Sequence, residues 1–340
     1  MQSPAQVFAS HLVANLARYG VNFWLAPGAR SQALAIAAES VSHVSDSKLF
    51  VRIDERSLAF TALGAASSGQ LQAIITTSGT AVANLHPAVL EAHHSGIPLI
   101  LLTADRPAEL RGKGANQTTN QVGIFNDAVI ECIDVVAPTE KDVAELPGRA
   151  RDLVKRVVEL ARAKRQPVQL NLQFIEPLSA TEPVAAEIYK TLNVEEIPVT
   201  ISDKTSMQLS NTAVVIAGAS AEEHREEIAQ LGLPVFAEPS SGVRDLGNSI
   251  SNYRKLLADR NHLFGEIEQI VVYGKPTLSR PVISLLKSEN IEVLVRPGRM
   301  GNFQIPETAK TITAEIANPS SDASWLQSWL DTEEQNPTVG

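Results

Sequence analysis

Short apolar segments alternate with helical segments through the first half of the chain, and this pattern restricts the fold more than any other feature. The clearest apolar segments run from Ala73 to Thr76 and from Leu99 to Thr103. Continuous apolar strands of this kind are buried on both faces, as happens when helices cover both sides of a parallel sheet. Further strands are expected over 21–25, 49–53 and 168–173, and helices over 31–40, 56–67, 80–94 and 141–164.

The second half repeats this alternation on a smaller scale. Strands are expected over 214–217, 235–237, 270–273 and 292–296, with helices over 221–231, 250–258 and 280–287. We therefore predict an α/β fold with two doubly wound, mostly parallel sheet domains. The predicted domains are residues 1–180 and 206–318, joined by a linker at 181–205 that shows no sustained hydrophobic period. A C-terminal helix and tail at 319–340 carry Trp325 and Trp329 on one helical face.

Composition narrows the class of protein. The 340 residues carry a net charge of −9, which argues against a general nucleic-acid partner or an anionic membrane surface, because both need clustered cations. A single cysteine, Cys132, rules out an internal disulfide and a cysteine-based metal site. No apolar run is long enough to span a membrane. We expect a cytoplasmic protein.

Polar turns follow the strands of the first domain at the edge where ligands bind in open α/β sheets. They lie at 26–31, 54–57, 77–80 and 104–107. Glu55 in the second of these turns is the most informative residue. Taken alone, it reads as an acid favoured by the helix dipole at a helix start. With the other three turns around it, a binding or catalytic role is favoured.

Common phosphate-binding motifs are absent. Neither G-x-G-x-x-G nor G-x-x-x-x-G-K-[ST] occurs in the chain. The turn at 217–220 has the form of an anion-binding helix start, but a tight structural turn is the more favoured interpretation.

The turns together resemble the pyrimidine-binding domain of thiamine diphosphate enzymes. The resemblance rests on Ala26-Pro-Gly-Ala-Arg-Ser31, Asp54-Glu-Arg-Ser57 and Thr76-Thr-Ser-Gly-Thr80. Ala104-Asp-Arg-Pro107 followed by Ala115-Asn-Gln117 is more specific: it is similar to the 2-succinyl-5-enolpyruvyl-6-hydroxy-3-cyclohexene-1-carboxylate (SEPHCHC) synthases of menaquinone biosynthesis. A weaker resemblance to the central domain of that family extends through the second half.

The resemblance implies a cofactor site in the first domain. Glu55 would hydrogen-bond the aminopyrimidine ring of thiamine diphosphate and favour the imino tautomer that accepts the thiazolium proton. Besides Glu55, it implies these cofactor-binding residues: Pro27, Gly28, Ser78, Gly79, Thr80 and Asn84.

The resemblance also implies the substrates. The enzymes of this family are transferases that decarboxylate 2-oxoglutarate and add the product to isochorismate. The residues implied for holding isochorismate and its two carboxylates are Arg30, Arg106, Asn116, Gln117 and Arg280. Guanidinium groups suit carboxylates in both charge and geometry. Two positions depart from the family: Ser279 stands where a lysine is usual, and Ala29 where a hydroxyl residue is common.

The main departure concerns the cofactor's diphosphate. The family holds it through Mg²⁺ in a further domain with a Gly-Asp signature, but none of the 19 glycines here precedes an aspartate. We expect this chain to lack that domain and its metal site, to be inactive alone, and to act within a homo-oligomer, a dimer or tetramer. Two alternatives stay open: a non-catalytic fragment or regulatory binding module, and another thiamine-dependent 2-oxo acid synthase or decarboxylase.

Overall fold

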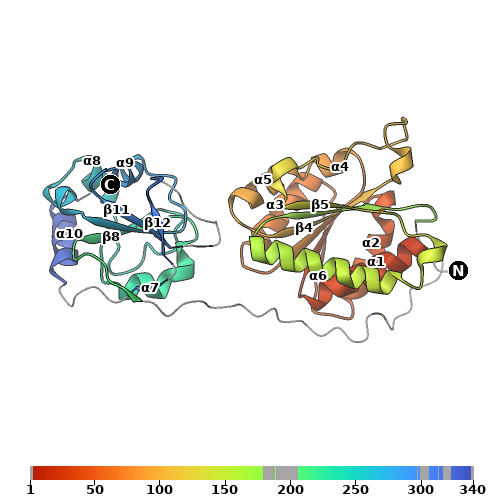
Figure 1. Ribbon diagram of the computed structural model, residues 1–340, viewed down its shortest axis with the longest axis horizontal. Coiled ribbons are helices and arrows are strands. Elements are labelled where there is room, and N and C mark those ends of the chain that lie inside the picture. The colour runs from red at the N-terminus through yellow and green to blue at the C-terminus, as the bar shows by residue number, and fades with distance from the viewer. Residues whose placement is uncertain are drawn as a thin grey trace. The chain divides into compact units, whose positions relative to one another are not determined.

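The computed structural model describes residues 3–178, 188, 206–296, 298, 306–312, 314–316 and 323–337. The chain divides into two compact units, Met1–Pro198 and Val199–Gly340 (Figure 1). The predicted linker lies outside the described residues except for position 188. The predicted domain limits therefore stay predictions.

The first unit contains a six-stranded sheet in the order β2-β1-β3-β4-β6-β5, and every neighbouring pair is parallel. Its strands are β1 (Asn22–Leu25), β2 (Leu49–Val51), β3 (Gln72–Thr76), β4 (Leu99–Asp105), β5 (Glu131–Val135) and β6 (Val168–Gln173). The edge strand β5 was not predicted, and β2 ends two residues earlier than expected. All residues of β1, β3, β4 and β6 are buried.

Helices cover both faces of this sheet (Figure 1). One face packs against α1 (Pro4–Arg18), α2 (Gln32–Ser42) and α6 (Leu146–Lys164). The other packs against α3 (Glu55–Ala66), α4 (Thr80–Ala83) and α5 (His86–His94). In β1, Phe23 and Leu25 enter the first core and Trp24 enters the second. The strands are apolar on both sides because each side meets helices.

Two helices of the first unit differ from the prediction. The helix expected over 80–94 is two helices, α4 and α5, with Pro87 in the first turn of α5. A proline lacks the N–H needed inside a helix but is accommodated in a first turn. The helix expected from 141 begins at Leu146, again with a proline in its first turn.

The second unit contains a five-stranded parallel sheet in the order β12-β11-β10-β8-β9, and a separate parallel pair, β13-β7. Its strands are β7 (Ser206–Met207), β8 (Ala213–Ala217), β9 (Val235–Ala237), β10 (Gln269–Tyr273), β11 (Glu292–Arg296), β12 (Lys310–Thr311) and β13 (Glu315–Ile316). Its α-helices are α7 (Arg225–Gln230), α8 (Tyr253–Ala258), α9 (Arg280–Leu286) and α10 (Ser324–Gln335). Helices α7 and α8 are shorter than predicted. The predicted fold class is confirmed.

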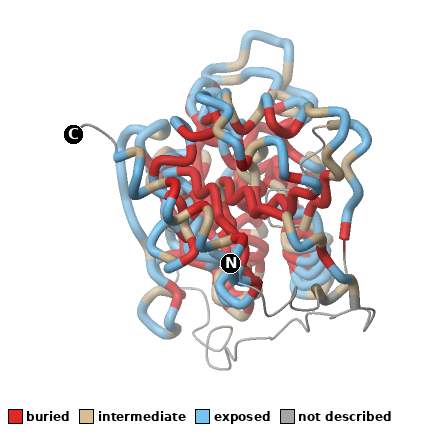
Figure 2. The backbone as a smooth tube through the Cα atoms, turned by 90° about the vertical axis from the view of Figure 1, so that its left-hand side faces the viewer, coloured by how far each residue is buried: buried red, intermediate tan, exposed pale blue. Residues whose placement is uncertain are grey.

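The predicted C-terminal helix, α10, is part of the second core rather than an appendage. Trp329 is fully buried, and its ring centroid lies 5.0 Å from that of Phe236. Trp325 donates a hydrogen bond from Nε1 to the carbonyl oxygen of Ala213 at 2.9 Å. Across both units, buried residues follow the strands and the helix faces turned toward them (Figure 2).

We predict that Trp329→Ala lowers the free energy of unfolding of the second unit by about 3–5 kcal/mol, the usual loss for a buried tryptophan. Hydrogen exchange measured by mass spectrometry on peptides of β8 and β10 would report this loss. Gln327→Ala is the matched control, because Gln327 is exposed on the same helix. Equal losses in both variants would contradict the packing of α10 described here.

Candidate active site

The first sheet has a topological switch point between β1 and β3. From β1 the chain first moves outward to β2 and then returns across to β3. At such a point the connections leave in opposite directions, and a crevice opens at the carboxyl ends of the strands. The predicted turns at 26–31 and 77–80 follow these two strands.

The two turns approach each other so closely that one position must be glycine. A Cβ atom at Gly28 would lie 2.4 Å from Cβ of Thr77. The backbone of Gly28 is extended, with φ −170°, so close approach and not backbone strain requires glycine here. Predicted residues Gly28 and Pro27 thus lie beside the turn that holds Ser78 and Gly79.

Glu55 is the first residue of α3 and is half-buried. The helix start is fixed by Asp54, whose side chain accepts a hydrogen bond from the backbone N–H of Ser57 at 2.7 Å. Nδ2 of Asn84, at the end of α4, donates to Oε2 of Glu55 at 3.3 Å. The structure therefore brings together two predicted cofactor residues that are 29 positions apart. Thr80 is exposed at the start of α4.

Arg106 is only 9% exposed and holds two segments together. Its Nη1 donates to Oγ of Ser78 at 2.6 Å and to the carbonyl oxygen of Gln117 at 2.7 Å. Nε2 of Gln117 in turn donates to the carbonyl oxygen of Ser78 at 3.0 Å. Three predicted site residues are thus connected, and the guanidinium of Arg106 also has a structural role that the sequence did not reveal.

Arg30 lies near Arg106. Its side chain is 12% exposed, and Nη1 donates to the carbonyl oxygen of Phe174 at 3.1 Å. Burial, followed by the charge of Arg106, lowers the pKa of Arg30. Glu176 lies 3.5 Å from Nη2, while Nε is buried without a hydrogen-bond partner. Arg30 and Arg106 thus place two guanidinium groups, which suit carboxylates, at this edge.

The remaining two acceptor-site predictions have weaker structural support. Asn116 is exposed, and its carbonyl oxygen accepts a hydrogen bond from Oγ1 of Thr118 at 3.1 Å. Arg280 is exposed at the start of α9 in the second unit, where it lines a pocket of about 250 Å³ with Arg260 and Phe264. The roles assigned to Asn116 and Arg280 stay predictions.

A buried ion-pair network beneath Arg106 was not predicted. The carboxylate of Asp105, which has no exposed area, accepts hydrogen bonds from the backbone N–H of Arg106 at 2.7 Å and from Nδ2 of Asn171 at 2.9 Å. Nη2 of Arg111 lies 2.9 Å from the same carboxylate, and Arg111 also binds Asp134 through two hydrogen bonds. Asp105 thus fixes the backbone from which Arg106 extends.

Hydrogen bonds shift the pKa values of Asp134 and Arg111 in this network. Burial alone would raise the pKa of Asp134, but the hydrogen bonds from Arg111, Asn171 and Gln173 outweigh burial and lower that pKa. The hydrogen bond to Asp134 is also the main reason why the pKa of Arg111 is raised. Both groups are therefore charged at neutral pH.

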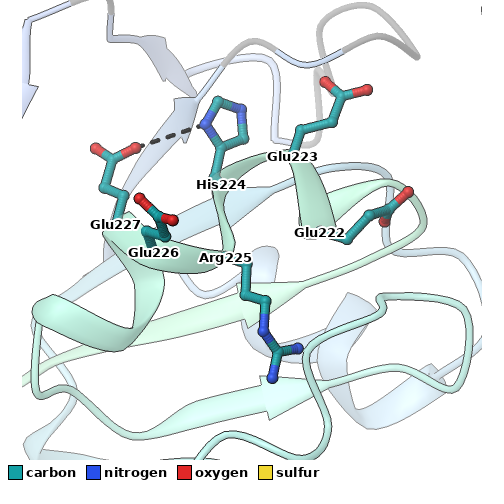
Figure 3. A pocket seen from close by; sticks show the side chains of 6 residues that line it. All are labelled: Glu222, Glu223, His224, Arg225, Glu226 and Glu227. Carbon is teal, nitrogen blue, oxygen red and sulfur yellow. Dashed lines mark ion pairs between the residues drawn. The ribbon is translucent and has the colours of Figure 1, made fainter. Parts of the chain in front are cut away.

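A pocket of about 480 Å³ in the second unit has the wrong charge for an anionic substrate. Its described lining residues are Glu222, Glu223, His224, Arg225, Glu226 and Glu227. Their side chains fan outward and do not converge on one point (Figure 3). Burial acts to raise the pKa of Glu227, but the hydrogen bond with His224 and the charge of Arg296 lower it.

The turn at 217–220 is structural, as favoured from the sequence. The backbone N–H groups of Gly218 and Ala219 donate to the carbonyl oxygens of Tyr273 and Lys275, at 2.9 and 3.1 Å. These donors are therefore engaged within the fold.

Among the described residues, no group of three or more His, Cys, Asp or Glu side chains could hold a metal ion. No described helix is long and apolar enough to cross a membrane.

Comparison with known proteins identifies the family to which the residues at this edge of the sheet belong. Residues 7–124 match the family model of the thiamine pyrophosphate enzyme N-terminal TPP binding domain. The match covers β1 to β4 and the turns that carry Gly28, Glu55, Ser78 and Arg106. Residues 7–124 therefore form a domain of the thiamine diphosphate enzyme family, and the resemblance seen in the sequence is confirmed.

Individual relatives that match most of the chain share the name 2-succinyl-5-enolpyruvyl-6-hydroxy-3-cyclohexene-1-carboxylate synthase. The chain is 41% identical to the protein of that name from Kineococcus radiotolerans over 86% of its own length and 54% of the relative. It is 40% identical to the Leifsonia xyli protein over 96% of the chain and 58% of the relative. For the Thermobifida fusca protein the values are 37%, 95% and 60%. The chain thus spans little more than half the length of these relatives.

We predict that Gly28→Ala destabilises the first unit by about 1–3 kcal/mol, because the added methyl group would overlap Thr77. The backbone can adopt the required angles with alanine, so the effect measures the approach of the two turns. Urea denaturation would report the change.

Gly64→Ala provides the control for that substitution. Gly64 lies inside α3, and a Cβ atom there would meet nothing within 4 Å. Alanine in a helix should stabilise by about 0.5–1 kcal/mol relative to glycine. If Gly28→Ala were tolerated as well as Gly64→Ala, the turns would not be packed as described.

Proposed function

We propose that this chain supplies the pyrimidine-binding part of a thiamine diphosphate-dependent transferase that decarboxylates 2-oxoglutarate and adds the product to isochorismate. The proposal places the protein in menaquinone biosynthesis, as a SEPHCHC synthase. The names of the relatives support it, and so does the arrangement at the carboxyl edge of the first sheet.

The observation that carries the proposal is the pair Arg30 and Arg106. Arg30 follows β1, and Arg106 follows β4 and contacts Ser78 in the turn after β3, so both guanidinium groups belong to the carboxyl edge of the sheet. Burial, and then the charge of Arg106, lower the pKa of Arg30. Such a pair is stabilised when an anion lies between or against the guanidinium groups. Isochorismate carries two carboxylates, whereas a synthase or decarboxylase with an uncharged acceptor would gain nothing from this pair.

The residues at the other side of the edge fit the cofactor. Glu55 offers a carboxylate oriented by Asn84, which suits an aminopyrimidine ring. Gly28 and Gly79 let the turns pack closely against Thr77 and Gln117, since a Cβ atom at Gly79 would lie 3.0 Å from Cγ of Gln117. Bound thiamine diphosphate would supply the electron sink that decarboxylation of a 2-oxo acid requires.

Each group of the chain then has a separate task. Glu55 holds a hydrogen bond to the cofactor's pyrimidine ring and sets its protonation state. Arg30 and Arg106, with Asn116 and Gln117, orient the carboxylates of the acceptor by charge and hydrogen bonding. Arg280 of the second unit is proposed to reach the same acceptor. Pro27, Gly28, Ser78, Gly79 and Thr80 shape the backbone around the cofactor.

The remaining parts of the proposal concern the assembly. Mg²⁺ would help to hold the diphosphate, and we propose that its ligands are not among these 340 residues, which contain no Gly-Asp pair. We also propose a homo-oligomer that acts in the cytoplasm on small-molecule substrates, with no nucleic-acid partner. The single cysteine, Cys132, is consistent with a reducing compartment.

The first test replaces the proposed catalytic carboxylate. The chain would be combined with the C-terminal part of the Kineococcus relative, since we expect the chain alone to show no turnover. Glu55→Gln should slow hydrogen–deuterium exchange at the thiazolium carbon of the bound cofactor by about 10²–10⁴-fold. NMR of the cofactor measures that rate directly.

Asp54→Asn is the matched control for Glu55→Gln. Asp54 is the neighbouring acid, and asparagine caps a helix about as well as aspartate. Asn84 can still donate to the new amide oxygen at position 55, so folding should be retained in both variants. Equal exchange rates in the wild type and Glu55→Gln would remove Glu55 from the mechanism.

The second test addresses the acceptor. Arg30→Ala should raise KM for isochorismate about tenfold or more, the expected effect of losing a charge-assisted hydrogen bond of about 1.5–3 kcal/mol. Consumption of 2-oxoglutarate without isochorismate should be spared. Arg30 is a cleaner choice than Arg106, because replacing Arg106 also removes the hydrogen bonds to Ser78 and Gln117.

Arg18→Ala serves as the control for a lost arginine, since Arg18 ends α1 just before β1 begins, near the amino end of that strand and not at the carboxyl end that carries the turn. An unchanged KM for isochorismate in Arg30→Ala would exclude the proposed acceptor role. Equal impairment of both half-reactions would point instead to another thiamine-dependent enzyme.

A further inference from the structure

Gln121 is fully buried beside the turn after β3, and none of the roles assigned above includes it. Its Oε1 accepts a hydrogen bond from the backbone N–H of Gly79 at 2.9 Å. Its Nε2 donates to the carbonyl oxygen of Ala104 at 3.2 Å and to Oδ1 of Asn171 at 2.8 Å. The amide oxygen and both amide hydrogens thus have partners, so the orientation of the side chain is fixed.

The turn that Gln121 contacts depends on a partner of this kind. Gly79 has φ 82° and ψ −138°, a conformation that residues with a side chain avoid. Its N–H is buried, and a buried donor without an acceptor is strongly unfavourable. Gln121 therefore supplies the acceptor that makes this backbone conformation stable.

The proposed cofactor residues and the proposed acceptor residues are both connected to this turn. The carbonyl oxygen of Gly79 accepts the hydrogen bond from Val82 that begins α4, and α4 ends at Asn84, the partner of Glu55. The preceding residue, Ser78, accepts the hydrogen bond from Arg106. A displacement of Gly79 would thus reach the proposed cofactor residue and the proposed acceptor residue.

We propose that Gln121 is a positioning residue, which acts through the N–H of Gly79 to fix the Ser78–Thr80 turn between Glu55 and Arg106. Its importance for catalysis rests on the proposed function, but its action on the turn does not. The test therefore measures the turn itself, in the full chain without cofactor or substrate.

The first variant is Gln121→Met, which keeps the length of the side chain and removes its hydrogen bonds. Amide exchange of Gly79, followed by NMR, should accelerate about tenfold, because a hydrogen bond that protects it is lost. The side-chain NH₂ resonances of Asn84 should also shift, because its contact with Glu55 follows the turn.

Gln169→Met is the matched control. Gln169 is equally buried, and its Nε2 donates to Oγ1 of Thr103 at 3.0 Å and to the backbone carbonyl oxygen of Gln121 at 3.2 Å. Its side chain donates to Thr103 and Gln121 and not to the turn, so Gly79 exchange should stay within about twofold of the wild type. A similar acceleration in both variants would mean general loosening and would overturn the proposal.

A second variant, Gln121→Glu, adds a pH dependence that simple destabilisation does not produce. The introduced carboxyl would face the oxygens of Ala104 and Asn171, while Nδ2 of Asn171 is already engaged by Asp105 and Asp134. Only the protonated carboxyl can donate to one of these oxygens while accepting from Gly79. Burial raises the pKa of such a carboxyl in the folded chain, so its contribution is present at low pH and is lost as pH rises through that value.

The protection factor of Gly79 in Gln121→Glu should therefore be close to that of the wild type at acidic pH and fall as the carboxyl ionises. The wild type should show no such transition. A pH-independent protection factor in this variant would overturn the proposal, as would unchanged Gly79 exchange or unchanged Asn84 resonances in Gln121→Met. Normal Glu55→Gln and Arg30→Ala enzymes would instead overturn the proposed function and leave these exchange results valid.

Discussion

Burial of the first sheet on both faces leaves its carboxyl edge as the place for functional side chains, and the rest of the site follows from this constraint. Strands β1, β3 and β4 are completely buried, so a polar group along them would need a buried partner. At the strand ends the chain turns into loops, and polar residues can collect there. The switch point between β1 and β3 then decides which turns meet, and the absence of a side chain at Gly28 lets them approach.

Electrostatics determines how two arginines can share this edge. Burial, and then the charge of Arg106, lower the pKa of Arg30. The charge of Asp105 opposes both effects, because it acts to raise the pKa of Arg30. The side chain of Asp105 also accepts a hydrogen bond from the backbone N–H of Arg106. The fully buried carboxylate of Asp105 is hydrogen-bonded to Asn171 and ion-paired with Arg111. Two cationic side chains are thus held at the edge where we propose that an anion binds.

The fold and the positions of most proposed site residues could be predicted from local patterns. Continuous apolar strands indicated a parallel sheet, and the polar turns after them placed Gly28, Glu55, Ser78 and Arg106 at one edge. Asn84 followed from the family resemblance, and the structure gives it a contact with Glu55. The roles of these residues in binding and catalysis stay predictions.

The residues that sequence reasoning missed are buried polar ones. In β6 the alternation Val-Gln-Leu-Asn-Leu-Gln is typical of a strand with one face in water, yet Gln169 and Asn171 have no exposed area. Their partners are Thr103 on the neighbouring strand, Asp134 in β5, and the polar segment that runs from Asp105 to Gln121. Those pairings join positions 37 to 68 residues apart, so no local pattern reveals them. The edge strand β5 was missed for a related reason, because Glu131 and Asp134 interrupt its apolar residues.

Arg106 shows why a residue's role in a family need not be its only role in the fold. One nitrogen of its guanidinium already serves Ser78 and Gln117, so the same side chain stabilises the turn and contributes positive charge to the proposed acceptor site. Because both hydrogen bonds come from Nη1, the two acceptors do not themselves need the guanidinium fork; a lysine would keep the charge but would lack the further nitrogens that suit a carboxylate. Gln117 also has a structural role, because its side-chain amide donates to Ser78 and its backbone carbonyl oxygen accepts a hydrogen bond from Arg106. The structural role and the proposed functional role therefore meet in the same side chain at this edge.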